Sequence, residues 1–469
     1  MKWGDGMGPI LLADLGSTYT KVISIDPNRP AILGQAYGLT SVNDGIEIGL
    51  KQATDQLIEM TGIPLDRYDT RLASCSAAGG LKMVAIGLVP ELTAEAANRA
   101  ALGAGARVMK TYAYLLSGAD ICEIESADTD IILLAGGTDG GDTKTILANA
   151  EKIAKSSLRI PIIIAGNRTV AEEVALMLHD AGKTIHMTEN VLPSLKKLNI
   201  DPARALIRSI FMEQIIRGKG FEKAQAFMGN ILMPTPAAVM EGATLLSTGT
   251  DSESGWGDLM VVDIGGATTD VHSIARGEPT TPGTYQRGIP EPFAKRTVEG
   301  DLGLRVSAAS LLAAVGAKKI QACCGWPLED LGKHIEHLTT AVDYLPVSQE
   351  DERLETAMAA AAVELAMERH VGRLDRLMTP AGVMVTQTGK DLGKVMHVIG
   401  TGGIFAHSPE WLSILRQTKF SMERPDLLKP LDPIMWVDGK YILWAMGLLA
   451  QVNPGVAIRL LKDHLVSEV

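Results

Sequence analysis

The feature of this chain that most constrains its fold is a pattern that occurs twice, far apart in the sequence. At residues 10–25 the letters ILLADLGSTYTKVISI form an apolar run, then Asp14, Gly16 and two hydroxyl residues, then a second apolar run. At residues 259–270 the letters LMVVDIGGATTD repeat this order, with Asp263 before a pair of glycines. Short apolar runs favour strands, and glycine permits a tight turn with exposed main chain. Each segment therefore predicts a hairpin with a carboxylate beside its turn.

The chemistry of such a turn favours a bound phosphate. Backbone N–H groups and hydroxyls can hold phosphate oxygens, whereas the carboxylates repel phosphate and reach it only through Mg²⁺, which prefers oxygen ligands and keeps several waters. An ordinary hairpin turn is the alternative for either segment taken alone. Two such segments in one chain indicate two lobes that face one nucleotide. The predicted cofactor-binding residues of the two turns are Gly16, Ser17, Thr18, Lys21, Gly265, Gly266, Thr268 and Thr269. Asp14 and Asp263 are the predicted metal-binding residues.

A third glycine-rich turn is predicted near the C-terminus. The letters VMHVIGTGGIFAHSP at residues 395–409 indicate a strand that ends in glycines. Because glycine lets the backbone approach a bound group closely, Gly400, Gly402 and Gly403 are predicted to line an adenine or a ribose.

Two helices with small residues are predicted between and after these turns. Residues 234–246 contain Gly242, and residues 441–452 contain Gly447. Small side chains let two helices cross closely, which suits a hinge between lobes. The five segments, in this chain order, resemble the actin, sugar kinase and Hsp70 ATPase superfamily. The resemblance implies an α/β fold with two ribonuclease H-like lobes that bind ATP and Mg²⁺.

One departure from the Hsp70 pattern affects the expected chemistry. Hsp70-type proteins carry a glutamate just before the proline of the first connecting helix, and this chain has Thr235 there. We therefore expect slow hydrolysis, because the usual residue for positioning the attacking water is missing. Glu241 lies further along the same helix, but Asp270 is the better candidate to orient water. The predicted catalytic set is Asp14, Asp263 and Asp270.

Composition excludes several other classes of function. A chain of 469 residues is too long for one ordinary core. Its net charge of −11 argues against nucleic-acid binding through a broad basic surface. No apolar run approaches the roughly 18 residues of a membrane span, and the N-terminal residues do not follow a signal-peptide pattern. The four cysteines contain no CxxC pair, which is typical of reduced thiols in a cytoplasmic protein.

Two additions to the lobes are predicted. Apolar runs in the first half of the chain alternate with helical periodicity, which indicates an open parallel α/β sheet. We place this inserted module at about residues 120–230, within lobe I at residues 1–247. Lobe II then covers residues 248–469, with a helical cap at about residues 310–385. The C-terminal connecting helix is expected to return toward lobe I.

The inserted module contains the most glycine-dense loop, AGGTDGGDTK at residues 135–144. It lacks the GK[ST] ending of a P-loop. One interpretation is a second ligand or partner-docking loop, since N–H groups at a helix start can bind anions. The other is a tight turn from strand to helix in which Asp142 caps the helix. Glycine alone identifies no ligand, so both interpretations stay open.

Three other groups of residues carry alternative interpretations. The charged set in AKRTVEGDLGLR comprises Lys295, Arg296, Glu299, Asp301 and Arg305. Its cations could stack on adenine or pair with phosphate, or the set could begin an exposed helix. Cys323 and Cys324 lack the spacing of an iron–sulfur site, so structural thiols are expected. His334 and His337 could supply half a metal site, or lie on a solvated helix face.

A closer resemblance rests on LLAGGTDGGD, AKRTVEGDLGLR and DIGGATTDV, and it runs over essentially the whole chain. These segments resemble the methylaspartate (glutamate) mutase accessory family, often called MutL and unrelated to the mismatch-repair protein of that name. The resemblance implies an ATP-driven, chaperone-like factor that removes damaged cobalamin from an inactivated adenosylcobalamin-dependent amino acid mutase. The mutase is the expected partner, and a homodimer is a further expectation.

The cobalamin itself is expected in the partner. DVHSIA at residues 270–275 nearly matches the cobalt-binding motif DxHxxG, but Ala275 stands where the glycine belongs. Two alternatives to the accessory function remain. One is a small-molecule kinase of the same superfamily with Asp270 as its base, and the other is a filament-forming actin-like protein.

Overall fold

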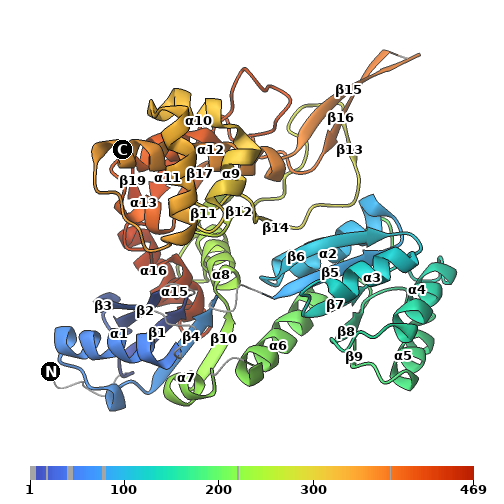
Figure 1. Ribbon diagram of the computed structural model, residues 1–469, viewed down its shortest axis with the longest axis horizontal. Helices are drawn as coiled ribbons and strands as arrows, with labels where there is room; N and C mark the ends of the chain where they lie inside the picture. Colours follow the sequence, from blue (N-terminus) through green and yellow to red (C-terminus); the bar gives the residue numbers. More distant parts are fainter. Residues whose placement is uncertain are drawn as a thin grey trace. The chain divides into compact units, whose positions relative to one another are not determined.

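The computed structural model describes residues 7–16, 19–39, 46–76, 81–218, 221–380 and 382–468. The chain forms two compact units, whose helices and strands are labelled in Figure 1. Unit 1 comprises Met1–Ser74, Ala226–Arg287 and Phe293–Val469, and unit 2 comprises Cys75–Gln225 and Gly288–Pro292. The two predicted lobes share unit 1, since each contributes one sheet to it.

The first sheet of unit 1 has the strand order β10-β4-β1-β2-β3. Its strands are β1 (Ile10–Leu15), β2 (Tyr19–Asp26), β3 (Ala31–Leu39), β4 (Thr70–Cys75) and β10 (Asn230–Pro234). Every residue of β1 is buried, as expected for the apolar run that encodes it. Helix α1 (Ile46–Thr61) packs against β2 and β3, and α7 spans Phe221–Met228. The first predicted hairpin is confirmed, with β1 antiparallel to β2 and Asp14 opposite Lys21.

The second sheet of unit 1 has the order β14-β12-β11-β17-β18-β19. Its strands are β11 (Leu259–Ile264), β12 (Thr269–Ile274), β14 (Ala294–Glu299), β17 (His397–Thr401), β18 (Ile434–Val437) and β19 (Val466–Ser467). The second predicted hairpin is also confirmed, with β11 antiparallel to β12 and Asp263 opposite Asp270. Strand β17, which carries the third glycine turn, pairs with β11 in parallel. All three predicted turns are therefore positioned by strands of unit 1.

Two helices cross closely beside these sheets. Helix α8 (Thr235–Thr248) and helix α15 (Leu443–Leu449) lie side by side (Figure 1), and α16 (Pro454–His464) contacts both. A Cβ atom on Gly447 would lie 1.8 Å from the Ala238 carbonyl oxygen, and one on Gly242 would lie 2.6 Å from the Leu443 carbonyl oxygen. The predicted close crossing is confirmed, because any larger residue at these glycines would force the backbones apart. The three helices share one apolar core with residues of both sheets.

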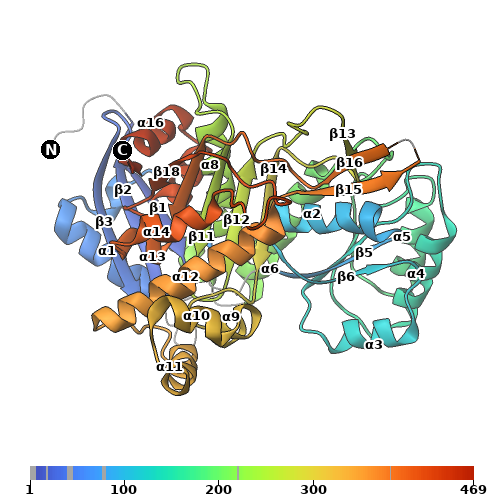
Figure 2. The ribbon, with the colours of Figure 1, turned by 90° about the horizontal axis from the view of Figure 1, so that it is seen from above.

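A helical cap and a small sheet complete unit 1. The cap contains α9 (Ala308–Val315), α10 (Ala317–Cys324), α11 (Leu328–Thr340) and the long α12 (Gln349–His370), which Figure 2 shows along its length. A capping box formed by Ser348 and Asp351 starts α12. The predicted cap at residues 310–385 is helical only as far as His370, because the chain then turns into a strand pair. The small sheet has β13 (Thr284–Arg287), β15 (Arg373–Thr379) and β16 (Gly382–Thr388).

The remaining short helical segments of unit 1 lie near the glycine turn after β17 and near the N-terminal sheet. They are α13 (Gly403–His407), α14 (Trp411–Leu415) and the turns Leu65–Arg67 and Arg416–Thr418.

Unit 2 is an open parallel α/β sheet with the order β6-β5-β7-β8-β9. Its strands are β5 (Lys82–Gly87), β6 (Arg107–Ala113), β7 (Ile131–Leu134), β8 (Ile162–Ile164) and β9 (Ile185–Met187). Its helices are α2 (Glu95–Gly103), α3 (Gly118–Ser126), α4 (Lys144–Lys155), α5 (Ala171–Asp180) and α6 (Asp201–Gly218), with a π turn at Pro90–Ala94. In Figure 2 strands β5 and β6 lie between α2 and α3.

The parallel module predicted from the sequence is confirmed as an α/β sheet, but it begins earlier than residue 120. The chain enters unit 2 at Cys75, because β5 pairs with β6 and β7 and not with the N-terminal sheet. In order of appearance the five strands are arranged 2-1-3-4-5, which is the order of flavodoxin-like sheets. Among the described residues, no helix has the length and apolarity that crossing a membrane requires.

Candidate functional site

The first acidic residue, Asp14, is surrounded by partners that satisfy its charge. Its side chain is buried at the end of β1. Thr235 donates a hydrogen bond to Asp14 Oδ1 at 2.5 Å, and Ser74 donates to the same oxygen at 3.2 Å. Lys21 places its ammonium 3.5 Å from Asp14 Oδ2. Residues from β1, β2, β4 and α8 therefore meet at this one carboxylate.

The second hairpin carries two carboxylates that face each other across β11 and β12. Asp263 keeps some exposure, but the surrounding protein removes most of its hydration. This burial, followed by repulsion from Asp270, raises the pKa of Asp263 to about 7, with a smaller contribution from Asp14. The cations Lys21 and Arg296 act in the opposite direction. The structure thus brings the three predicted catalytic carboxylates within electrostatic range of one another.

Asp270 is held by a cation on the neighbouring strand β14. Arg296 Nη2 donates to Asp270 Oδ2 at 2.8 Å, and both side chains are buried. The other carboxylate oxygen, Asp270 Oδ1, is buried and has no hydrogen-bond partner among the residues that the structure describes. An unpaired buried carboxylate oxygen is costly, so it marks a position where a polar ligand would be stabilised.

The turn of the second hairpin exposes its amide groups. Gly265, Gly266 and Ala267 are exposed, and within the described residues no acceptor contacts the N–H groups of residues 266–268. The carbonyl groups point the other way, since Leu304 N–H donates to Gly265 O at 3.1 Å and Arg305 N–H donates to Gly266 O at 2.8 Å. Free N–H groups at a turn of this kind form a concave site for anions.

A segment that the sequence suggested as an adenine or phosphate contact or as an exposed helix start instead braces this turn. It covers residues 299–307, and Ser307 Oγ donates to Ala267 O at 2.7 Å. Thr269, predicted to bind phosphate, is fully buried and instead donates to Leu302 O at 2.6 Å. The phosphate contact predicted for the Thr269 hydroxyl is therefore replaced by a contact within the brace, because the side chain points into the protein.

Ion pairs join the brace to the helical cap. Arg369 on α12 donates to Glu299 at 2.6 Å and to Asp301 at 2.7 Å. Arg305 pairs with Glu355 on the same helix and also contacts the Tyr344 carbonyl. Lys295 donates to His370 O at 3.0 Å. In the described residues, the charged side chains of this set thus make contacts that tie β14 and the brace to α12.

The three predicted glycines at the end of β17 and just after it have different surroundings. A Cβ on Gly400 would lie 2.6 Å from the Phe405 ring, so glycine there makes room for an aromatic residue of α13. Gly402 has a φ of +105°, and its Cβ would lie 2.5 Å from Ile264 O and 3.0 Å from Asp263 Oδ1. Gly403 faces open space. Gly402 therefore brings this turn against the acidic end of β11.

The predicted residues of the first turn are partly described. Ser17 and Thr18 lie outside the described residues. A Cβ on Gly16 would lie 2.4 Å from Tyr19 O, so only glycine fits this tight turn. Ser74 and Tyr441 also approach the cluster of Asp14, Asp263 and Asp270, which we call the acidic cluster. Neither was predicted as a site residue, because the segment that begins at Tyr441 was recognised only by the small residues of its helix. Lys21 stands 3.7 Å from the centroid of the Tyr441 ring.

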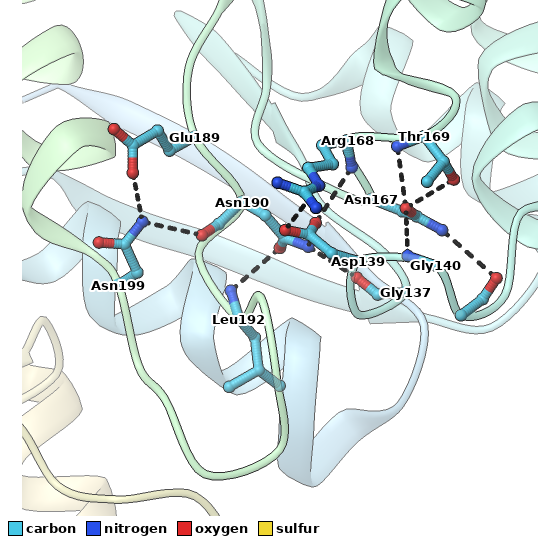
Figure 3. A network of polar contacts seen from close by, with 11 residues as sticks. Gly137, Asp139, Gly140, Asn167, Arg168, Thr169, Glu189, Asn190, Leu192 and Asn199 are labelled. Atoms are coloured by element: carbon cyan, nitrogen blue, oxygen red, sulfur yellow. Dashed lines mark hydrogen bonds and ion pairs between the residues drawn. The ribbon is translucent and has the colours of Figure 1, made fainter.

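The glycine-dense loop of unit 2 is held by a polar network that Figure 3 shows from close by. Asn167 accepts from Gly140 N–H at 3.1 Å and donates to Asp142 O at 3.2 Å. Asn190 donates to Asp139 Oδ1 at 2.9 Å, and Arg168 lies 3.6 Å from the same carboxylate group. Asp142 Oδ1 accepts from Thr145 N–H at 3.0 Å, at the start of α4. These contacts favour the tight-turn interpretation, since the loop's polar groups bond mainly to Asn167, Arg168 and Asn190 of neighbouring loops.

The two histidines of α11 belong to an aromatic cluster. The His334 ring lies 4.8 Å from Trp326 and 5.6 Å from Tyr344, and His337 lies 5.6 Å from Tyr344. Burial lowers the pKa of His334.

Searched over the described residues, no group of three or more His, Cys, Asp or Glu side chains has the arrangement of a metal site. A metal beside the acidic hairpins would therefore rely on water ligands as well as carboxylates.

Three further residues were singled out in the sequence. His272, from the near match to the cobalt-binding motif, is fully buried, and its ring nitrogens have no hydrogen-bond partner among the described residues. Burial lowers its pKa well below 6.5, so the ring is neutral. Cys323 is exposed and Cys324 is buried, and both are free thiols.

Two sheets joined by crossing helices, with an acidic hairpin in each sheet, define the two-lobed actin-like fold predicted from the sequence. The chain belongs to the MutL protein family, whose model matches residues 10–465. It is 48% identical over 460 residues to the curated "Protein MutL" of Clostridium tetanomorphum, covering 98% of this chain and 100% of that protein. This is the mutase accessory family expected from the sequence.

Solved structures give weaker likenesses. A glycerol dehydratase reactivase is 10% identical, with 94% of this chain and 99% of the other covered and a TM-score of 0.35. A xylulose kinase from Bifidobacterium adolescentis is 11% identical, with 99% and 96% covered and a TM-score of 0.30. Likenesses of this size add nothing to the description of the fold above.

Proposed function

We propose that this chain binds Mg-ATP at the acidic hairpins, hydrolyses it slowly and acts as an accessory factor that reactivates an adenosylcobalamin-dependent amino acid mutase. The observation that carries the nucleotide part is the electrostatics of the second hairpin. Asp263 and Asp270 face each other, and Asp14 adds to the repulsion that raises the Asp263 pKa to about 7. Bringing such charges together is unfavourable unless a cation compensates them. Carboxylate oxygens are the ligands that Mg²⁺ prefers, so the residues fit this ion.

The residues of this chain have separate roles in the proposed hydrolysis. The free amides of residues 266–268 hold phosphate oxygens beside the carboxylates. Asp270 offers its unpartnered oxygen Oδ1 to a water, while the hydrogen bond from Arg296 keeps the other oxygen fixed. When bound, Mg²⁺ supplies positive charge that stabilises the phosphate being transferred.

Hydrolysis is expected to be slow because Thr235 takes no part in positioning water. Its hydroxyl is committed to Asp14 Oδ1 at 2.5 Å. No glutamate stands at this position to orient a nucleophile. We expect a basal turnover well below about one per second, the lower end of ordinary enzyme turnover. A faster basal rate would contradict this part of the proposal.

The partner part of the proposal draws on family membership and on unit 2. The α/β sheet of unit 2 is not needed to form the acidic hairpins, all of which lie in unit 1. We infer that the additional unit serves contact with a protein. A nucleotide can drive such a contact only if it binds the free and the complexed states with different affinity. The partner must then change nucleotide affinity by the same factor.

The experiment that tests the proposal measures nucleotide binding and mutase recovery together. Calorimetry gives ATP and ADP affinities with and without a cobalamin-inactivated mutase of the same organism, and mutase turnover is followed after fresh cofactor is added. We expect a shift in nucleotide affinity and ATP-dependent recovery of turnover. If neither occurs, the accessory function fails. If ATP instead phosphorylates a small metabolite, the kinase alternative replaces it.

A further inference from the structure

Tyr441 has a backbone conformation that a tyrosine rarely adopts. Its φ is +50°, in the left-handed region, and only one other non-glycine residue of the described chain, Tyr114, has a positive φ. Tyr441 follows β18 and directly precedes the connecting helix α15. Side chains with a Cβ atom are strained in this region, and such strain persists only where the surroundings impose it.

The surroundings of Tyr441 impose this conformation from both sides. Its N–H donates to Asp438 O at 3.0 Å, and its carbonyl accepts the Trp444 indole N–H at 2.9 Å. The Asp438 carboxylate accepts from Ile442 N–H and Leu443 N–H, both at 2.9 Å. The turn at residues 438–441 is therefore fixed at the start of α15, and so is the direction in which the Tyr441 side chain leaves the backbone.

The fixed ring lies under the only cation that contacts Asp14 in the described residues. Lys21 Nζ is 3.7 Å from the ring centroid and 3.5 Å from Asp14 Oδ2. The ammonium thus stands between a carboxylate and the negative face of an aromatic ring. Burial raises the pKa of the Tyr441 hydroxyl well above 10, and Asp263 and Asp14 are the next largest causes. The ring therefore lies within the acidic cluster itself.

The two carboxylate oxygens of Asp14 differ in their partners, and this difference decides where a metal cation can approach. Thr235 and Ser74 both donate to Oδ1, so they leave Oδ2 as the oxygen that faces a cation. Lys21 already occupies that side. A divalent cation that approaches Asp14, directly or through its waters, must compete with a cation that belongs to the chain.

We infer that Tyr441 holds the Lys21 ammonium beside Asp14 as a built-in counter-ion, which Mg²⁺ must displace in order to bind. This inference rests on the proposed function, because it concerns the same Mg-nucleotide site. Cation–π attraction over a tyrosine face strengthens when water is excluded. Removing the ring should therefore weaken the competitor and tighten Mg²⁺ binding, which is the reverse of what damage to a binding site produces.

Three variants test the inference. Tyr441→Asn removes the ring but keeps a residue that tolerates the left-handed backbone. Tyr441→Leu removes the ring and keeps apolar bulk, and Tyr441→Phe is the matched control because it keeps the ring. Mg²⁺ affinity is measured by calorimetry at saturating ADP, and thermal unfolding is followed in EDTA to establish that each variant is folded.

The expected result is a lower dissociation constant for Mg²⁺ in Tyr441→Asn and Tyr441→Leu, by roughly threefold to tenfold, given the usual strength of a cation–π contact. Tyr441→Phe should stay within about twofold of the parent on the same scale. Unchanged or weaker Mg²⁺ binding in both ring-deleted variants, if they are folded, would overturn the inference while leaving the proposed function intact. A parent chain that binds neither Mg²⁺ nor ADP would instead overturn both.

Discussion

The two acidic hairpins follow the same order of residues in the sequence and yet differ in electrostatic state. In the β1–β2 hairpin, Asp14 has hydrogen bonds from Ser74 and Thr235 and an ion pair with Lys21. In the β11–β12 hairpin, no hydrogen bond to the Asp263 carboxylate is found within the described residues, and the facing Asp270 repels it. The turn sequence alone therefore does not decide how a carboxylate behaves. Neighbours from other strands and helices decide it, and they leave the second hairpin short of positive charge.

The largest expected effect tests whether the carboxylates of the hairpins, Asp263 above all, are needed for ATP hydrolysis. Asp263→Asn should lower Mg-ATP hydrolysis by tens to thousands-fold, the scale for losing a group that stabilises a transferring phosphate. Asp14→Asn should also lower hydrolysis, since both carboxylates face the proposed metal. Steady-state phosphate release is the measurement. Asp258→Asn, at an exposed position just before β11, is the control. Normal hydrolysis by Asp263→Asn would remove this residue from the site.

The next effect tests the helices that hold the two hairpins together. Gly447→Ala places a methyl group 1.8 Å from the Ala238 carbonyl, so α8 and α15 must separate. We expect a loss of about 3 kcal/mol in the free energy of unfolding, at the upper end for overpacked cores. Urea unfolding followed by circular dichroism measures it. Gly439→Ala is the control, because nothing lies within 4 Å of the added Cβ. Equal stability of the two variants would contradict the close crossing.

A smaller effect tests the charge deficit of the second hairpin through pH. The pKa of Asp263 is raised from 3.8 to about 7, so between these values the folded chain keeps a proton that the unfolded chain has released. This group therefore makes folding less favourable as pH rises from about 4 to about 7, and the loss stays complete above that range. At pH 8 the ligand-free Asp263→Asn variant should be more stable than the parent by about 2 kcal/mol, less than the full shift implies because the carboxylates titrate together.

The measurement for this prediction is a series of urea unfolding curves between pH 4 and pH 8. The stability difference should shrink toward the acid end, where Asp263 is protonated in the folded state and partly protonated in the unfolded state. The Asp258→Asn variant should show no such trend. A difference that is constant with pH would mean that Asp263 is not short of positive charge.

The smallest effect tests the β1–β2 hairpin, in which the Asp14 carboxylate has hydrogen-bond partners and an ion-pair partner. Thr235→Val keeps the shape of the side chain but removes the hydrogen bond to Asp14 Oδ1. We expect the chain to lose about 1 kcal/mol of stability, the usual net value of one such hydrogen bond. Thr235→Ser is the control, because it keeps the hydroxyl. If Val and Ser behave alike in thermal unfolding, the contact does not contribute to the stability of the first hairpin.

The sequence by itself determined the local elements of this protein. Apolar runs that end in Asp and Gly predicted both hairpins, and the small residues around Gly242 and Gly447 predicted two helices that cross closely. These predictions succeeded because strand and turn preferences, and the room that glycine leaves, are properties of neighbouring residues. The family resemblance was also carried by short stretches of sequence, and the comparisons confirmed it.

Only the tertiary structure decided which residues meet. The sequence placed β5 in lobe I, but its pairing with β6 and β7 assigns it to unit 2. It assigned the Thr269 hydroxyl to phosphate, but the side chain bonds to Leu302. It gave no sign that Ser74 and Tyr441 approach Asp14 and Lys21. Contacts between residues hundreds of positions apart depend on how sheets and helices pack, and no local pattern encodes that packing.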